Sequence, residues 1–385
     1  MKIVMIDPSA FTPPYDHHLC KGLSQVGHDV TLLATDFEYI GWEDEIMYNK
    51  LDFFYQWTNR FYSEESRSWH RQLIKGSEHI LGMVSLLKKI KQLDPDIIHF
   101  QWLPVPILDR LFVNKLKNIA AVVHTVHDTE PYHGATPSRL QVWGARSAPQ
   151  LFDRIIVHTD DGKDTLVNRG IARSKVSVIP HGPIRYPESS QNTKSKCNSD
   201  ANNKQTILFF GGIKEYKGVD VLLRSFANLP SELQNQTKLK IAGSPSVEMK
   251  SLYSLAARLG IEEYVEWDVR YIPDEEVPML FESTDLVVFP YRNADQSGAL
   301  MTALPYGNPI VATDVGGFSK ILTDDVHGYL VEPESPESLS TALENVLSNE
   351  SKQAQMSEAV LDLSENVYSW EKIAEQTIHV YKSAI

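Results

Sequence analysis

The sequence has few of the features that mark secreted, membrane-spanning or nucleic-acid-binding proteins. Only two of its 385 residues are cysteines, Cys20 and Cys197, so it offers neither a disulfide framework nor a metal-binding spacing, and a reducing cytoplasm is expected. No apolar run approaches the roughly 20 residues that cross a bilayer. The N-terminal MKIVMIDPSAF is expected to be a first strand and not a signal peptide. A net charge of −13 argues against general nucleic-acid binding.

Length and charge distribution favour two domains. A chain of 385 residues is too long for one ordinary compact core. Residues 1–185 carry 21 Lys and Arg and 21 Asp and Glu, so the whole net charge of −13 comes from residues 186–385. Such an asymmetry fits two domains with different neighbours. With 42% hydrophobic and 23% charged residues, the composition is that of a soluble globular protein.

Two series of short apolar runs predict two successive α/β domains. Residues 1–35 are expected to form a strand, the polar loop DPSAFTPPYDHH, a helix and a second strand, and further strands recur up to VSVIPHG. Residues 69–93 show helical spacing, whereas 36–68 show no clear period and stay unassigned. After the polar linker YPESSQNTKSKCNSDANNKQT the alternation restarts at TILFFGG, and the chain ends in a helical tail. We place the boundary between Pro183 and Thr206.

The motif FFGGIKEYKGVDVLL combines a strand end, a glycine-containing loop and a helix start. Gly211 and Gly212 allow the backbone to approach an anion, and a helix start offers free N–H groups. Lys214 and Lys217 add charge at the same place. The combination suits a diphosphate, although it is neither G-x-G-x-x-G nor a Walker A motif. An ordinary strand–helix turn with solvated lysines is the alternative, and the motif alone does not decide between them.

Histidines follow two of the predicted strands of the first domain. Ligands of doubly wound sheets bind beyond the carboxyl ends of the strands. His127 occupies such a position in VHTVHDTEPY and is predicted to donate to a sugar hydroxyl or to stabilise a developing charge, whereas His124 is expected to be a satisfied core histidine. Asp16, His17 and His18 lie in the segment after the first strand. An acid next to two imidazoles could act as a base. Helix capping by Asp16 beside solvated histidines is the preferred reading.

The segment DLVVFPYRNADQSGALMTALPYG places a polar, almost uncharged loop between an apolar strand and a helix start. Gln296, Ser297 and Gly298 precede the helix start, so backbone N–H groups are expected to be available there. Neutral side chains and free amides suit the many hydroxyl groups of a sugar. Asp295 is the only acid in the loop.

Taken together, these stretches resemble the family 4 glycosyltransferases. The resemblance implies the α/β GT-B fold, in which two Rossmann-like doubly wound domains face a central cleft and a C-terminal helix crosses back to the first domain. It covers most of the chain. The matching stretches are QVGHDVTLL, DPDIIHFQW, TVHD, FDRIIVHT, VSVIPHG, FFGGIKEYKGVDVLL, IPDEEVPMLFESTDLVVFPY, SGALMTALPYGNPIVATDVGGF and HGYLVEP.

The resemblance also implies the reaction. Residues 1–185, with the helix 368–385, would bind the acceptor, and residues 186–367 would bind the nucleotide-sugar donor. The expected enzyme transfers a hexose from a UDP- or GDP-sugar to a hydroxyl of a glycan, glycolipid or small-molecule acceptor, as in polysaccharide biosynthesis. It would retain the anomeric configuration, and it would need no metal and no cofactor beyond the nucleotide-diphosphate sugar itself.

The same resemblance assigns roles to residues of this sequence. Lys217 matches the diphosphate lysine, His127 the histidine that faces the donor sugar, and Asp295 is the acid nearest that sugar; these three are the catalytic candidates. The donor-binding candidates are Gly211, Gly212, Lys214, Lys217, Gly243, Arg270, Tyr271, Gln296, Ser297, Gly298, Ala299 and Thr302. The acceptor-binding candidates are Tyr15, Asp16, His17 and His18, and the last three are also the candidates for the base of an inverting route.

The sequence departs from the family pattern at three positions. Gly212 stands where the family usually has an arginine, and Lys214 would supply part of that charge. Ala294 and Thr302 stand where the family usually has two glutamates, and Thr302 offers ribose only a weaker, neutral hydrogen bond. These departures leave three alternatives open on the same fold: a nucleotide-sugar epimerase, a phosphorylase and a non-catalytic sugar-nucleotide-binding subunit.

A basic cluster in the first domain raises the question of membrane contact. It lies around the end of one apolar helix and in the segment that follows. Its residues are Lys88, Lys89, Lys91, Arg110, Lys115 and Lys117. Peripheral contact with the cytoplasmic face of the membrane is one reading. A solvated helix end is slightly preferred, because the first domain is neutral overall.

Overall fold

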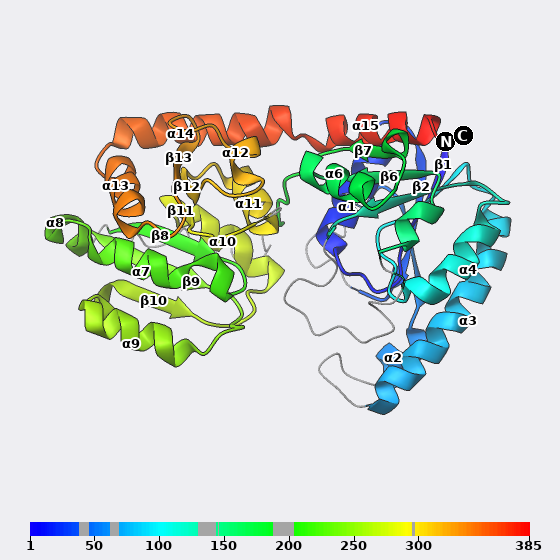
Figure 1. The fold of residues 1–385 in the computed structure, drawn as a ribbon, viewed down its shortest axis with the longest axis horizontal. Helices are drawn as coiled ribbons and strands as arrows, with labels where there is room; N and C mark the ends of the chain where they lie inside the picture. The colour runs from blue at the N-terminus through cyan, green and yellow to red at the C-terminus, as the bar shows by residue number, and fades with distance from the viewer. Residues whose placement is uncertain (38–45, 62–68, 130–143, 145, 188–203, 295–296) are drawn as a thin grey trace. The chain divides into compact units, whose positions relative to one another are not determined.

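The computed structural model describes residues 1–37, 46–61, 69–129, 144, 146–187, 204–294 and 297–385. They form two compact units, of which the first comprises Met1–Gly182 with Trp370–Ile385 and the second comprises Pro183–Ser369. Each unit contains one parallel sheet with helices packed on it (Figure 1). The predicted return of the C-terminal helix to the first unit is confirmed.

The sheet of the first unit has the strand order β3-β2-β1-β4-β5-β6-β7, and each pair of neighbouring strands is parallel. Its strands are β1 Lys2–Asp7, β2 Asp29–Thr35, β3 Asn49–Phe54, β4 Ile97–Phe100, β5 Ala121–Val126, β6 Arg154–Val157 and β7 Val176–Val178. Its helices are α1 Pro13–Gln25, α2 Gln56–Phe61, α3 Trp69–Leu93, α4 Pro106–Leu116, α6 Asp160–Asn168 and α15 Trp370–Lys382.

The sheet of the second unit has the order β10-β9-β8-β11-β12-β13, again with parallel neighbours. Its strands are β8 Gln205–Phe210, β9 Thr237–Ala242, β10 Val265–Asp268, β11 Leu286–Phe289, β12 Ile310–Thr313 and β13 Gly328–Val331. Its helices are α7 Val219–Ala227, α8 Ser231–Asn235, α9 Met249–Leu259, α10 Val277–Glu282, α11 Gly298–Ala303, α12 Phe318–Ile321, α13 Pro336–Leu347 and α14 Glu350–Asp362.

The central strands of both sheets are buried, which explains their almost unbroken apolar sequences. All four residues of β4 and of β11 are buried, as expected for parallel strands with both faces covered. The helical spacing predicted over 69–93 is confirmed as α3, and the apolar runs of the second half are confirmed as β8, β9 and β11. Buried hydrophobic residues pack on the sheet within each unit.

Strand order places the candidate sites. The order reverses between β1 and β4 in the first unit and between β8 and β11 in the second. At such a switch point the loops that leave the two strands run in opposite directions and leave room for a ligand at their carboxyl ends. The residues that follow these four strands are therefore the first places to look for chemistry.

Two predictions near the N-terminus are wrong in detail. Residues predicted as a loop up to His18 are helical, because α1 begins at Pro13. A proline in the first turn lacks only an N–H that would have no helical partner, and its fixed φ suits a helix start. Asp16 does not cap this helix, since Thr12 occupies the cap position without a side-chain hydrogen bond. The unassigned 36–68 region contains β3 and α2 within its described part.

Candidate active site

Aromatic and imidazole rings gather at the switch point of the first unit. Tyr15 in α1 is buried, and its ring lies 4.8 Å from His127, 5.4 Å from His158 and 4.8 Å from His181 between ring centroids. Trp102, which follows β4, stacks on His127 at 5.1 Å with an interplanar angle of 11°. These contacts hold His127 in one orientation beyond the end of β5.

Hydrogen bonds use both nitrogens of His127. His158 Nδ1 lies 2.9 Å from the carbonyl of Ile179 and must carry the proton, because a carbonyl only accepts. A neutral His158 then accepts at Nε2 from His127 Nδ1, 3.2 Å away. His127 Nε2 lies 2.9 Å from Gln101 Oε1, so a neutral His127 completes the chain only if Gln101 turns its amide nitrogen to the ring.

The histidines of this cluster are held neutral. Burial lowers the pKa of His158 to about 4. Burial, with the neighbouring His158, lowers the pKa of His181 to about 3. The pKa of His127 also lies well below its usual value, because of burial and the four histidines around it. His127 therefore does not supply a positive charge at neutral pH, and it can orient a sugar hydroxyl only by exchanging one of its two hydrogen bonds for it. The expectation for His124 is confirmed, since it is buried and its Nδ1 lies 3.0 Å from the carbonyl of Phe100.

The predicted acceptor-binding residues lie in α1 in different surroundings. Asp16 is buried beside Asp7, and neither of its carboxylate oxygens has a hydrogen-bond partner within the described structure. Burial, followed by the neighbouring Asp7, raises the pKa of Asp16 well above its usual value, which favours the protonated acid. His17 is buried with Nδ1 3.1 Å from the Tyr48 hydroxyl, and His18 stacks on Trp370 at 5.4 Å. Because its side chain is 0% exposed, Asp16 is poorly placed to reach an acceptor hydroxyl.

Glycines bring the loops of the second unit together. Gly243 has φ +151°, and a Cβ placed on it would lie 2.1 Å from the carbonyl oxygen of Gly211. Gly218 has φ +66°, and its Cβ would lie 2.0 Å from the carbonyl oxygen of Pro290. Any side chain at these positions would push the loop after β8 away from its two neighbours. The loops that follow β8, β9 and β11 therefore meet closely.

Lys217 lies where these loops meet. Its Nζ is 5.0 Å from the centroid of the Tyr291 ring and 3.0 Å from where a Cβ on Gly211 would lie. The side chain is mostly buried, and burial lowers its pKa. Among the described residues, no acid forms an ion pair with it. A Cβ on Gly211 would also lie 3.5 Å from Ala299, so the predicted residues 211, 217 and 299 are brought together. A buried ammonium group without a counterion is suited to bind an anion.

The neighbouring Lys214 and Gly212 also lie together. A Cβ on Gly212 would be 3.8 Å from Lys214 Cε, so the lysine side chain passes beside the position where the family usually has an arginine. The same Cβ on Gly212 would lie 3.8 Å from the carbonyl oxygen of Ser244. This geometry is compatible with Lys214 supplying part of the missing charge.

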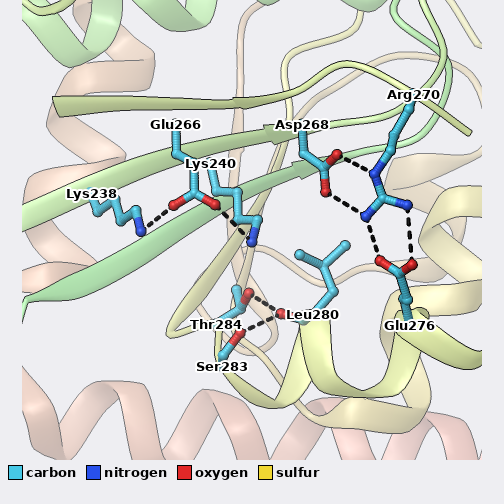
Figure 2. A network of polar contacts seen from close by, with 9 residues as sticks. All are labelled: Lys238, Lys240, Glu266, Asp268, Arg270, Glu276, Leu280, Ser283 and Thr284. Carbon is cyan, nitrogen blue, oxygen red and sulfur yellow. Dashed lines mark hydrogen bonds and ion pairs between the residues drawn. The ribbon is translucent and has the colours of Figure 1, made fainter. Parts of the chain in front are cut away.

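Arg270 and Tyr271, predicted to line the base, lie beyond β10. Figure 2 shows the Arg270 guanidinium held between Asp268 and Glu276, with Nε 2.7 Å from Asp268 and Nη1 3.1 Å from Glu276. Glu266, on the same strand as Asp268, pairs with Lys238 and Lys240. Tyr271 is largely exposed, and its hydroxyl donates to Asp274 at 3.2 Å. Because its charge is already compensated, Arg270 is not available as a phosphate ligand, but its planar group can still lie against a base.

The loop after β11 is described except for two residues. The predicted Asp295 and Gln296 lie outside the described residues. Ser297 caps α11, where its hydroxyl accepts from the N–H of Leu300 at 3.2 Å. A Cβ on Gly298 would meet nothing within 4 Å. The hydroxyl of Thr302 donates to the carbonyl of Gly298 at 3.1 Å, so its proton is used inside the helix and only its lone pairs remain for a ligand.

Gln101 was not among the predicted site residues, and Tyr291 was expected near the site from its place after a strand but was given no role. Gln101 comes directly after β4, and Tyr291 comes two residues after the end of β11. The position of a residue just beyond a strand end was the available signal. It could be used only with the strand order, which the sequence does not state.

Comparison with known families accounts for both units. A model described as "Glycosyl transferases group 1" matches residues 190–361, and one described as "Glycosyltransferase Family 4" matches residues 15–183. A D-inositol 3-phosphate glycosyltransferase of Nocardioides sp. is 28% identical over 68% of this chain and 62% of its own length. An uncharacterized glycosyltransferase of Methanocaldococcus jannaschii is 31% identical over 48% of this chain and 46% of its own length. This chain thus matches about half to three fifths of the length of these relatives.

Solved structures agree on the fold. HepE of Anabaena in complex with UDP superposes with a TM-score of 0.70 at 16% identity, covering 100% of both chains. Sucrose-phosphate synthase of Thermosynechococcus elongatus gives a TM-score of 0.71 at 16% identity, covering 100% of this chain and 98% of its own. Together with the two family models, this shows that the chain belongs to the group 1 and family 4 glycosyltransferases and is a transferase of the GT-B fold.

Proposed function

We propose that the enzyme transfers a hexose from a nucleotide-diphosphate sugar, with UDP-hexose as the first candidate and GDP-hexose as the second, to an acceptor hydroxyl. The observation that carries this proposal is the partly buried Lys217, which has no acidic partner within the described structure and lies against Gly211. Two further structures of the Anabaena HepE contain UDP-glucose, and UDP with glucose, which supports a UDP-sugar for this chain.

The proposed chemistry follows from the charge that develops on the leaving diphosphate. Lys217 stabilises that charge directly, and a preformed cation in a buried site costs no reorganisation when the sugar–oxygen bond breaks. This role needs no metal ion. The backbone of Ser297–Ala299 and the neutral His127 would orient the hydroxyl groups of the donor sugar. Asp295 and Gln296 keep their proposed roles beside that sugar, and Thr302 its proposed role towards the ribose.

Retention of the anomeric configuration is the stereochemistry we propose. An inverting route needs a general base from α1, and Asp16 is poorly placed for this role because its side chain is buried beside Asp7. His17 is a weak base, because burial lowers its pKa to about 4. The acceptor remains a glycan, a glycolipid or a small molecule with a free hydroxyl. Relatives named D-inositol 3-phosphate glycosyltransferase suggest that a phosphorylated polyol belongs in the acceptor panel.

A screen of UDP-, GDP- and ADP-hexoses tests the donor. Calorimetry measures binding, and proton NMR follows slow hydrolysis of the donor and the anomeric configuration of any product. We expect micromolar to millimolar binding of one nucleotide class and a product with retained configuration. Failure of all three classes to bind would contradict the proposed function, whereas an inverted product would contradict only the stereochemistry.

Peripheral contact with the inner face of the cytoplasmic membrane is a second proposal, supported by an exposed apolar face on α3. Among the described residues, no helix is long and apolar enough to cross a membrane. The face comprises Leu73, Ile80, Leu81 and Val84, which are 63%, 43%, 66% and 54% exposed. Exposed Lys88 and Lys91 lie one to two turns further along the same helix. An apolar face next to basic residues is typical of helices that lie on anionic membranes.

Co-sedimentation with phosphatidylglycerol vesicles at low and moderate salt tests this contact. We expect binding that weakens with salt and that Leu81→Ser together with Val84→Ser reduces at both salt concentrations. Leu361→Ser, at an exposed leucine of the second unit, is the matched control. Absence of binding to the wild-type chain at either salt concentration would remove the proposal.

A further inference from the structure

Tyr291 carries a buried hydroxyl that the proposed function does not use. Its side chain is 2% exposed, and its oxygen has no hydrogen-bond partner within the described structure. Ser297 is close enough to lower the pKa of the Tyr291 hydroxyl, but the two side chains do not reach the geometry of a hydrogen bond. Leaving a buried polar group unpaired costs about 1–3 kcal/mol, so such groups are uncommon without a ligand or function.

Packing, and not hydrogen bonding, fixes the ring of Tyr291. It makes edge contacts with Phe289, Phe318 and Tyr216 at centroid distances of 5.8, 5.3 and 5.9 Å. Its carbonyl accepts from the hydroxyl of Thr313 at 2.6 Å. The backbone and the ring are therefore held, and the hydroxyl cannot turn to a distant partner without breaking these contacts.

The place of Tyr291 in the fold points to the ligand. It follows β11, which neighbours β8 at the switch point of the second unit. The preceding Pro290 lies directly against Gly218, and the ammonium group of Lys217 lies 5.0 Å from the Tyr291 ring. A ligand oxygen that reaches Lys217 at the Gly211 turn therefore lies beside this ring.

The chemistry of the two groups selects an anion. Lys217 offers only N–H donors and pairs with no acid among the described residues, and the Tyr291 hydroxyl has no hydrogen-bond partner there. Burial raises the pKa of the Tyr291 hydroxyl, so it keeps its proton and donates beside a negative charge. An ammonium and a phenol with no acceptor between them fit the oxygens of a phosphate group. Gly212 stands where the family usually has an arginine, so that position offers no side chain to a phosphate.

We infer that Tyr291 is a further donor-site residue, whose hydroxyl donates a hydrogen bond to the diphosphate of the nucleotide sugar beside Lys217. The inference rests on the proposed function, because it needs a nucleotide diphosphate at the second unit. Tyr291 makes up part of the hydrogen bonding lost with Gly212, and its own unpaired hydroxyl is satisfied only when the donor is bound.

Tyr291→Phe tests the inference, because it removes only the hydroxyl. Calorimetric titrations with UDP, GDP and uridine are compared with thermal unfolding of the same full-length proteins. We expect UDP or GDP to bind about 10- to 100-fold more weakly, since a hydrogen bond to a charged group is lost. We expect uridine affinity and the melting temperature to stay equal, or the melting temperature to rise. Tyr253→Phe, at a half-exposed tyrosine of α9, is the matched control and should change neither.

The other outcomes are distinguishable. Unchanged nucleoside-diphosphate affinity in Tyr291→Phe would overturn the inference and leave the proposed function intact. An equal loss for UDP and uridine would overturn the assignment to the diphosphate. A drop in the melting temperature of Tyr291→Phe that disappears in a Ser297→Ala background would show that the two hydroxyls pair with each other, which also overturns it; the double variant is needed because Ser297 also caps α11. No binding of UDP or GDP to the wild-type protein would remove the proposed function itself.

Discussion

The histidines that follow β5 and β6 in the first unit and the residues that follow β8 and β11 in the second differ in how far the protein satisfies their polar groups. In the first unit His127 and His158 use both ring nitrogens within the protein, through Gln101 and the carbonyl of Ile179. In the second unit the Tyr291 hydroxyl meets no acceptor within the described structure, and the partly buried Lys217 beside it forms no ion pair with a described acid. A satisfied network fixes the orientation of its members, whereas unsatisfied buried donors are stabilised by a ligand. The comparison assigns positioning to the first unit and anion binding to the second.

Lys217→Ala should have the largest effect. Removal of the buried cation should lower the transfer rate about 10²- to 10³-fold, as loss of one preorganised charge-stabilising group does. Stability should hold or rise, because a buried ammonium group without a counterion is lost. Steady-state kinetics and thermal unfolding measure the two effects. Lys250→Ala, at an exposed lysine of α9, is the control, and an equal loss there would break the comparison.

Acid should destabilise the first unit more than the second. Burial lowers the pKa values of four histidines to about 3–4; they are His99, His124, His158 and His181. These side chains are neutral in the folded protein. As the pH falls, the unfolded chain therefore takes up protons before the folded protein does. Stability contributed by the neutral histidines is present above pH 6.5 and falls as the pH drops from about 6.5 towards 4.

Two other groups affect this pH dependence. The raised pKa values of Asp7 and Asp16 act in the opposite direction, because protonated acids add stability at low pH that is lost as pH rises. We expect the histidines to outweigh them, with a net loss on the order of a few kcal/mol between pH 7 and pH 5. Hydrogen exchange at the two pH values, corrected for the chemical rate, resolves the units. Equal loss in both units would contradict the comparison.

His158→Phe should destabilise the protein where Tyr291→Phe does not. The substitution keeps a ring in place but leaves the Ile179 carbonyl and His127 Nδ1 without their partner, which costs about 1–3 kcal/mol. Denaturant unfolding of the two variants beside the wild type measures the difference. Equal stabilities for the two variants would show that the first network is no better satisfied than the second site.

Lys214→Ala should have the smallest effect. The residue is partly exposed beside Gly212, so solvent screens its charge and we expect UDP to bind only about 2- to 5-fold more weakly. Lys320→Ala, at an exposed lysine of α12, provides the comparison. A loss as large as that of Lys217→Ala would mean that Lys214 replaces the missing arginine fully.

Local sequence predicted the elements well where periodicity was clear. Buried parallel strands such as β4 and β11, and the long α3, follow directly from apolar runs and helical spacing. The start of α1 was missed, because two prolines beside polar residues look like a loop until their place in the first helical turn is known. The half-exposed β3 likewise has no apolar period to detect.

The site was predictable only in part for a different reason. His127 and Lys217 carry chemistry in their side chains and follow strands, so they were found as candidates. Gln101 and Tyr291 become candidates through their neighbours, which depend on the strand order and on the close packing of loops. The unpaired state of the Tyr291 hydroxyl in particular is a property of the packed structure.

Amide hydrogen exchange with and without saturating UDP tests the central claim most directly. The account predicts that protection concentrates in the second unit, at Gly211–Gly218 and in the backbone of 290–303, while the histidine cluster around His127 and His158 changes little. Lys217→Ala should remove that protection at the same UDP concentration. Protection confined to the first unit, or protection in the second that persists in Lys217→Ala, would contradict the assignment of the donor site to the unpaired donors.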